Sequence, residues 1–514
     1  MTARTETNPQ VNKWIVALSV MLPTFIEVMD TSVVNVSLPH IQGSLNAGMD
    51  EVTWVLTSYL VSNAIIIPIS GWLAGVFGRK RYLIFSLLLF TGSSILCGAA
   101  PSLQVLILAR ILQGLGGGGL QPLSQAILLE TFPRREHGMA MAVFGMGVVM
   151  APIVGPVIGG WITDEWSWRW VFYINLPVGI LAIFMTILFL HDPAYIKRQV
   201  LRIDRWGLFL LAVGLGALQI VLDRGEREDW LHSNFIVLLS LVAALSLVLF
   251  VIVELHSENP VVDLRVFRNR SFSTGTIIMF LGFFSLFGGI VLLPLYAQQL
   301  MGYTAFWAGL VLGPGGIASF LIMPVAGTLM KKGVKPWLLL LTGVTIASYS
   351  LFMMSNFNLE RDFFSISLPR LVQGFGLGLF FVPLSAAAFA DINVLQMGNA
   401  SGVFNLVRNL GGSFGVAFAT TILSQRSQVH QTFLSEHITP YNPAFREALQ
   451  RAHSLLQSHH SAAAASSTGG LAFIYQEVLR QASMLAFNDA FYAFAASTAA
   501  LIPLTFLLRK RRKA

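Results

Sequence analysis

The sequence predicts an all-α polytopic membrane protein with 14 transmembrane helices, arranged as two six-helix bundles plus an inserted helix pair. Of the 514 residues, 55% are hydrophobic and only 11% are charged, whereas soluble domains carry about 25% charged residues. Apolar runs recur from Trp14 almost to the C-terminus, and their length of about 20 residues matches the hydrocarbon core of a bilayer. Lipid is therefore the solvent that organises this chain.

The apolar runs fall into a first set of six, a pair, and a second set of six. The first run is too long for a signal-peptide core and lacks a small-residue cleavage site, so we expect it to remain as the first span. The predicted spans are 14–37, 53–77, 82–100, 104–130, 138–163, 169–191, 206–222, 235–255, 272–299, 304–330, 336–355, 364–389, 399–424 and 486–508.

Two motifs of the first half return in the second half at nearly the same spacing. Residues 68–73 (PISGWL) return at 324–329 (PVAGTL), and residues 110–114 (RILQG) return at 370–374 (RLVQG). Transporters built from such repeats place their cargo site between the repeats. We therefore expect an N-terminal bundle at 1–200, two linker transmembrane helices at 201–260, and a C-terminal bundle at 261–514.

The formal net charge of +8 comes from short basic clusters between the apolar runs. This is the distribution that the positive-inside rule describes, and it predicts that both termini are cytoplasmic. It argues against a nucleic-acid-binding face. Cys97 is the single cysteine, so neither a disulfide framework nor a cysteine zinc site is expected.

Residues 425–485 are predicted to form one large periplasmic loop, in which 443–457 can form an amphipathic helix. The loop carries several histidines, which could bind a metal or could simply face water. Because they lack a compact ligand spacing, we predict a solvated loop and no metal. The histidines are His430, His437, His453, His459 and His460.

Glu27 and Asp30 are acidic residues inside the first span. An intramembrane carboxylate is costly unless it is protonated or paired, which makes it a functional hypothesis. Thr31 and Asn35 follow Glu27 by one and two helical turns, so one helix face gathers these polar groups. Two carboxyls this close disfavour double ionisation, which suits proton loading and release. In the alternative, Glu27 lies in an aqueous vestibule and only favours solubility.

Arg110 lies six residues into the fourth span, where a guanidinium needs a carboxylate partner. We predict that it modulates the proton affinity of Glu27 and Asp30. The alternative is a structural cation whose charge reaches the membrane interface. Arg370 is its repeat counterpart, but residues 271–299 contain no acid, so coupling is expected mainly in the first half.

Two glycine patterns favour close helix packing. Residues 114–119 (GLGGGG) formally satisfy G-x-G-x-x-G, but a nucleotide site needs a preceding strand, whereas these glycines lie in a span. No G-x(4)-G-K-[S/T] sequence occurs, so no cofactor and no ATP site are expected.

Ala151, Gly155 and Gly159 form a small-residue stripe, and Pro152 and Pro156 kink the same helix. This helix is predicted to be a hinge or sliding surface between bundles, with plain packing as the alternative.

Polar residues elsewhere in the spans form the predicted substrate-binding or gating set. Arg408 and Asn409 precede small residues in the thirteenth span, where they either contact cargo or hold a helix. The sequence leaves both possibilities open. The full set is Asn35, Gln113, Arg370, Arg408 and Asn409.

Further motifs run through most of the chain. Residues 29–39 (MDTSVVNVSLP) are close to L-D-x-T-I-V-N-V-A-L-P, and residues 145–160 fit G-x(6)-P-x-x-G-P-x-x-G-G. The pattern R-x-x-Q-G-x-G fits residues 110–119. Segments of the same family of transporters are similar to residues 168–177 (WRWVFYINLP) and 223–230 (DRGEREDW). The chain therefore resembles the fourteen-span drug:proton antiporters of the major facilitator superfamily, of the EmrB/QacA type.

One motif departs from the family pattern. The loop after the second span usually reads G-x-L-A-D-R-x-G-R-K, but here the Asp position is Gly75. The usual charge lock for the outward-facing state cannot be made there. The residues that we assign to the conformational motifs are Gly71, Gly78, Arg79, Lys80, Pro152, Gly155, Pro156, Gly159 and Gly160.

The resemblance implies a secondary transporter of the bacterial inner membrane that exports hydrophobic drugs or toxic compounds in exchange for protons. It also implies a periplasmic membrane-fusion adaptor (EmrA-like) and an outer-membrane channel (TolC-like) as partners. A dedicated exporter of an endogenous metabolite, siderophore or lipid is the nearest alternative, and a non-transporting sensor or scaffold is an alternative of another class. No H-E-x-x-H or other recognisable catalytic set occurs, so an enzyme is not expected.

Overall fold

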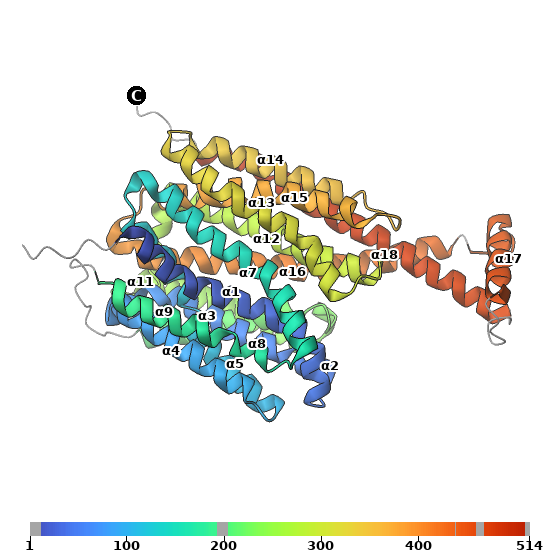
Figure 1. Cartoon of the computed structure of the whole chain (residues 1–514), viewed down its shortest axis with the longest axis horizontal. Helices are drawn as coiled ribbons and strands as arrows, with labels where there is room; N and C mark the ends of the chain where they lie inside the picture. Colours follow the sequence, from blue (N-terminus) through green and yellow to red (C-terminus); the bar gives the residue numbers. More distant parts are fainter. Residues whose placement is uncertain (1–11, 193–203, 437, 459–466, 509–514) are drawn as a thin grey trace, which may run out of the picture.

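The computed structural model describes residues 12–192, 204–436, 438–458 and 467–508. Figure 1 shows them as a bundle of long helices with a helical projection at one end. Within this described part, 14 helical segments are long and apolar enough to cross a membrane, and each overlaps one predicted span. The predicted fold class is confirmed.

The N-terminal bundle contains the first six of these segments. The fourth span was predicted as one helix, but it is interrupted at Gly118 and Gly119, because glycine is a poor helix former. The helices are α1 (Lys13–Ser44), α2 (Met49–Val52), α3 (Trp54–Phe77), α4 (Arg79–Gly98), α5 (Leu103–Gly117), α6 (Leu120–Thr131), α7 (His137–Glu165), α8 (Trp170–Tyr173) and α9 (Asn175–Phe189).

An inserted pair and the C-terminal bundle follow. The expected boundary at residue 200 lies outside the described residues, and the one at 260 falls in the segment between two helices. The pair is α10 (Arg205–Arg224) and α11 (Asn234–His256), and the bundle is α12 (Arg270–Gln299), α13 (Ala305–Lys331), α14 (Pro336–Met354), α15 (Phe363–Ala388), α16 (Met397–Ser435), α17 (Pro443–Ser458), α18 (Ser467–Ala499) and α19 (Leu501–Thr505).

Helix α7 packs against α1 of its own bundle and against α13 of the other bundle. Small residues on α7 and on α13 allow this close approach. A Cβ on Gly155 would lie 2.6 Å from Ser32 Cβ of α1, and a Cβ on Gly316 of α13 would overlap the side chain of Ile153. Helix α7 therefore lies at the seam between the bundles, where the predicted hinge or sliding surface requires it to be.

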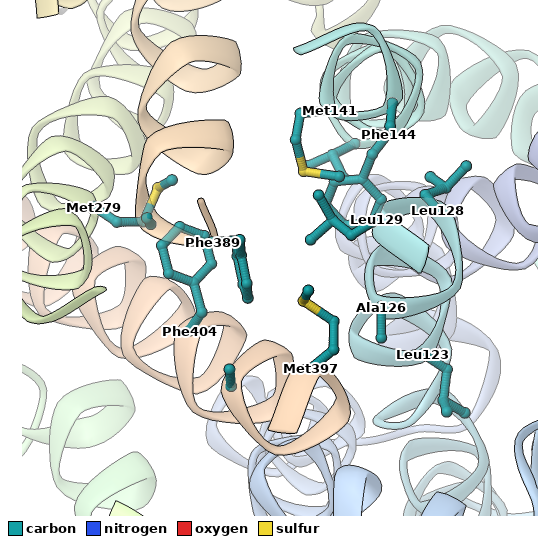
Figure 2. Close-up of a cluster of buried hydrophobic side chains, with 14 of the residues drawn as sticks. Leu123, Ala126, Leu128, Leu129, Met141, Phe144, Met279, Phe389, Met397 and Phe404 are labelled. Carbon is teal, nitrogen blue, oxygen red and sulfur yellow. The ribbon is translucent and has the colours of Figure 1, made fainter. Parts of the chain in front are cut away.

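The bundles also meet at the end where α1 begins and α19 ends, which we call the terminal face. Figure 2 shows apolar side chains of α6 and α7 on one side and of α12 and α16 on the other. Met397 lies between the two groups, and Phe144 of α7 stacks on Phe381 of α15 with ring centroids 6.2 Å apart. Because these side chains are buried, the terminal face is closed in this structure.

The segment 425–485 was expected to be a loop with one amphipathic helix at 443–457; that helix is present as α17, but most of the rest of the segment is also helix. Helix α16 continues to Ser435 and α18 already begins at Ser467, so the two helices extend together beyond the bundle, and α17 lies at their tip. Arg426 Nε of α16 donates to Asp489 Oδ2 of α18 over 2.5 Å, and His430 Nε2 lies 2.8 Å from the same oxygen. We call the described part of this projection the arm. Hydropathy did not detect the ends of α16 and α18 in the arm, because these ends are polar. They are held by contacts with each other and not by burial in lipid.

Candidate functional site

Asp30 of α1 and Arg110 of α5 form an ion pair inside the N-terminal bundle. Both side chains are 0% exposed, and Arg110 Nη1 lies 2.5 Å from Asp30 Oδ2. The guanidinium also donates through Nε to the Val55 carbonyl over 3.0 Å, and it lies over the Tyr59 ring at 4.1 Å from the centroid. The carboxylate partner that Arg110 requires is therefore Asp30.

Two amides complete the surroundings of Asp30. Gln113 Nε2 of α5 donates to Asp30 Oδ1 over 2.9 Å, and Asn175 Nδ2 at the start of α9 donates to the same oxygen over 2.7 Å. Ser94 of α4 accepts from both amides. Side chains of α5 and α9 thus contact the carboxylate of α1 directly, and Ser94 of α4 holds both amides in place.

Glu27 lies one turn before Asp30 and has different partners. It is 5% exposed and accepts from Asn63 Nδ2 over 2.9 Å and from Tyr59 Oη over 3.4 Å, both on α3. Gln121 of α6 also donates to it. The carboxylate is therefore enclosed by protein and does not lie in an open vestibule.

Arg408 connects this region to the other bundle. It is 2% exposed and donates through Nη2 to Gln121 Oε1 and to Asn409 Oδ1 over 3.4 Å. Its guanidinium faces the ring of Phe283 at 5.4 Å. Of the two roles that the sequence left open, this geometry favours holding a helix, because Arg408 spans from α16 to α6.

The remaining predicted binding residues do not gather at one place. Asn35 is exposed, so it does not share the buried environment of Glu27 and Asp30. Arg370 of α15 is 4% exposed and donates to Gln373, which repeats the pairing of Arg110 with Gln113. It makes no ion pair within the described residues, in keeping with the lack of acids in the facing span.

The conformational motif after the second span lies where α3, α4 and α16 meet. A Cβ on Gly71 would lie 2.6 Å from the backbone nitrogen of Asn399. Gly78 has a φ of +87°, which favours glycine. Arg79 pairs with Glu130 of α6, and Lys80 Nζ donates to the Ile187 carbonyl over 2.6 Å.

Two members of the α7 motif differ in their surroundings. A Cβ on Gly159 would lie 2.9 Å from Val33 Cγ1, whereas a Cβ on Gly160 would meet only Val36 Cγ1 at 3.9 Å. Pro152 and Pro156 lie inside α7 without ending it. Gly159 therefore belongs to the close α1 contact, and Gly160 does not.

Three charged residues join the bundles at the terminal face, and the sequence analysis did not identify them as a group. Glu136 lies in the short 3-10 helix η1 (Arg134–Glu136). It pairs with Lys13 of α1 and with Lys331 Nζ of α13 at 3.0 Å. The pair with Lys331 crosses between the bundles, whereas the pair with Lys13 lies within the N-terminal bundle.

Sequence reasoning also missed Asn63, Asn175, Gln121 and Tyr59. The three amides lie inside apolar runs, and an intramembrane polar residue is a signal in itself. No pattern along the chain shows which carboxylate each would reach. Their partners follow only from the helix packing.

The arm contains no cluster of three or more metal-ligating side chains among its described residues. His430 contacts Asp489, and a Cβ on Gly470 would lie 2.5 Å from His453 Nε2. The other three histidines lie outside the described residues.

Two repeated bundles of membrane-spanning helices, with a buried ion pair inside the N-terminal one, define a polytopic transport protein. The model of the Major Facilitator Superfamily matches residues 20–416. The multidrug export protein EmrB of Haemophilus influenzae is 38% identical over 483 residues, which is 93% of this chain and 92% of that protein. The chain therefore belongs to the Major Facilitator Superfamily and, within it, to the EmrB-type permeases.

Two further comparisons agree. The fatty acid resistance protein FarB of Neisseria gonorrhoeae is 36% identical over 496 residues, which is 96% of each chain. The solved structure of the human organic anion transporter MFSD10 (TETRAN) covers 96% of this chain and 100% of its own, with a TM-score of 0.59 and 13% identity. The second likeness concerns the fold alone.

Proposed function

We propose that this protein is a secondary active transporter of the bacterial inner membrane, which exports hydrophobic drugs or toxic compounds in exchange for protons. The observation that carries the proposal is the Asp30–Arg110 pair, which is fully buried near the middle of α1. The identity to EmrB supports the cargo class. The proton gradient supplies the energy, and no nucleotide, cofactor or catalytic step takes part.

Asp30 is the proton-binding residue in this mechanism. When its carboxyl is ionised, it holds Arg110 at 2.5 Å and the amide of Asn175 at 2.7 Å. Protonation removes the charge and releases Arg110 to other partners, which shifts the balance toward the state that is open at the terminal face. We assign that face to the cytoplasm, so both termini are cytoplasmic and the present structure is closed on its cytoplasmic side.

The membrane potential and the proton gradient supply enough energy for useful export. Moving one charge across 100 mV is worth about 2.3 kcal/mol, and each 1.4 kcal/mol changes an equilibrium about tenfold. One exchanged proton therefore supports a cargo gradient of about fifty-fold at that potential.

Proteoliposomes test the proposal directly. A hydrophobic dye is loaded, a pH gradient is imposed with the voltage clamped, and dye movement and proton flux are recorded together. We expect Asp30→Asn to abolish dye-dependent proton flux. The control Asp164→Asn changes an exposed carboxylate with 72% side-chain exposure and should leave the flux intact. Full coupling in Asp30→Asn would refute the assignment, and the absence of any transport would favour a sensor or scaffold.

The arm is the proposed docking surface for the membrane-fusion adaptor, which in turn contacts an outer-membrane channel. Helix α17 and the paired ends of α16 and α18 extend away from the bundle on the side opposite the terminal face. Replacing residues 438–466 with a short Gly/Ser linker should abolish copurification with the adaptor while dye transport in proteoliposomes continues. Undiminished copurification would contradict this role.

The likeness to FarB favours a second candidate, a dedicated exporter of lipid-like molecules. Competition separates the two. Transport of one dye should be inhibited by chemically unrelated dyes if the pocket is promiscuous, whereas inhibition by fatty acids alone would support the dedicated exporter.

A further inference from the structure

Gln121 lies between two charged side chains that belong to different bundles. Its amide nitrogen donates to Glu27 Oε2 of α1, and its amide oxygen accepts from Arg408 Nη2 of α16. All three residues are buried: Glu27 is 5% exposed, Gln121 is 7% exposed and Arg408 is 2% exposed. One side-chain amide thus joins a buried anion to a buried cation across the bundle interface.

Arg408 has little else to compensate its charge. Its Nε and Nη1 have no hydrogen-bond partner among the described residues. Glu27 lies directly beyond Gln121, because the same amide contacts both side chains. Charge interactions are strong where water is excluded, so the force that holds Arg408 toward α6 depends on whether Glu27 is ionised.

The neighbouring contacts between α6 and α16 carry no charge. Ser401 Oγ donates to the Pro122 carbonyl over 2.8 Å, and Asn405 Nδ2 donates to Gln125 Oε1 over 2.5 Å. Protonation of Glu27 therefore weakens the Gln121 contact and leaves its neighbours unchanged. The difference makes Gln125 a matched control for Gln121.

We propose that Gln121 and Arg408 are positioning residues that transmit the ionisation of Glu27 to α16. Ionised Glu27 holds α6 and α16 together with the terminal face closed, and protonation of Glu27 favours separation. The inference rests on the proposed proton exchange and adds a second proton-sensitive contact to it. Asp30 acts inside the N-terminal bundle, whereas Glu27 acts between the bundles.

Other charged and titratable groups also face Glu27 and enter the test. Tyr59 of α3 donates to it, Asp30 lies one turn further along α1, and Arg408 approaches from α16. Arg110 of α5 lies against the ring of Tyr59. The variants below therefore keep Asp30, Tyr59 and Arg110 unchanged.

Spin-label distances across the terminal face measure the separation as a function of pH. Labels at the exposed positions 135 and 335 report from η1 and from the residue before α14, in full-length protein in lipid nanodiscs. In the wild type, the separated population should rise as the pH falls. Glu27→Gln and Gln121→Leu should raise it about 3- to 15-fold at high pH, the range expected for one interhelical hydrogen bond, and should flatten the pH response.

Three comparisons show whether Gln121 acts through Glu27. The double variant Glu27→Gln/Gln121→Leu should be no more open than Glu27→Gln alone. Arg408→Lys keeps the charge and should retain part of the pH response. Gln125→Leu should keep the full wild-type pH response. Additive effects in the double variant, or a wild-type pH response in Gln121→Leu, would overturn the inference.

Two safeguards keep the test decisive. If Gln121→Leu does not fold, Gln121→Asn retains the amide but shortens its reach, and the same flattened response is expected. The Asp30→Asn transport assay separates this inference from the proposed function. Coupled wild-type transport that Asp30→Asn abolishes, together with an unchanged pH response in Gln121→Leu, would remove the transmission role alone.

Discussion

Removing one member of the Asp30–Arg110 pair should destabilise the fold strongly. The Asp30 carboxylate is 0% exposed, and Arg110→Gln removes its ion-pair partner. An uncompensated buried charge of this kind lowers the free energy of unfolding by about 3–5 kcal/mol. Asp30→Asn leaves the guanidinium in the same position, with a cost in the same range. The double variant removes both charges, so it should recover most of the loss.

Equilibrium unfolding in mixed SDS and detergent micelles measures these differences. Arg370→Gln is the matched control, because Arg370 is also buried but bonds to Gln373 and makes no ion pair in the described part of the chain. It leaves no carboxylate unpaired, so we expect a cost below about 1 kcal/mol. A double variant whose cost equals the sum of the two single costs would refute the reasoning, since independent residues add in this way.

Two further predictions concern the terminal face and the packing of α7 against α1 inside the N-terminal bundle. Glu136→Gln removes the ion pairs with Lys13 and Lys331, so labels across the terminal face should show more separation, while an unchanged distance distribution would contradict the lock. Gly155→Val should reduce dye export about tenfold or more, because even a Cβ there lies 2.6 Å from α1 and overpacking costs about 1–3 kcal/mol. The control Gly160→Val has space, and equal losses in both variants would count against a close α1–α7 contact.

The sequence was sufficient to locate the spans because burial in lipid requires long apolar helices, and each helix satisfies its own backbone. The break at Gly118 and Gly119 was not predicted, although glycine is a poor helix former. The amphipathic helix at 443–457 was predicted, but the paired ends of α16 and α18 were not, because they depend on contacts between distant segments such as Arg426 with Asp489.

The candidate site was likewise predictable from the sequence only in part. The acids Glu27 and Asp30 and the cation Arg110 could be identified from their cost in lipid alone. Their partners could not, because Asn175 and Gln121 are 145 and 94 residues away from the carboxylates that they contact. The two carboxyls look equivalent along the helix, but packing gives Asp30 a partner set within one bundle and Glu27 a link to the other.

Infrared difference spectroscopy tests the central claim most directly, because a protonated carboxyl group has its own C=O band. Membranes of the wild-type protein, perfused alternately with and without a transported dye, should show this band appear and disappear, and Asp30→Asn should remove the change. Steady export without any change in the Asp30 band would contradict the account.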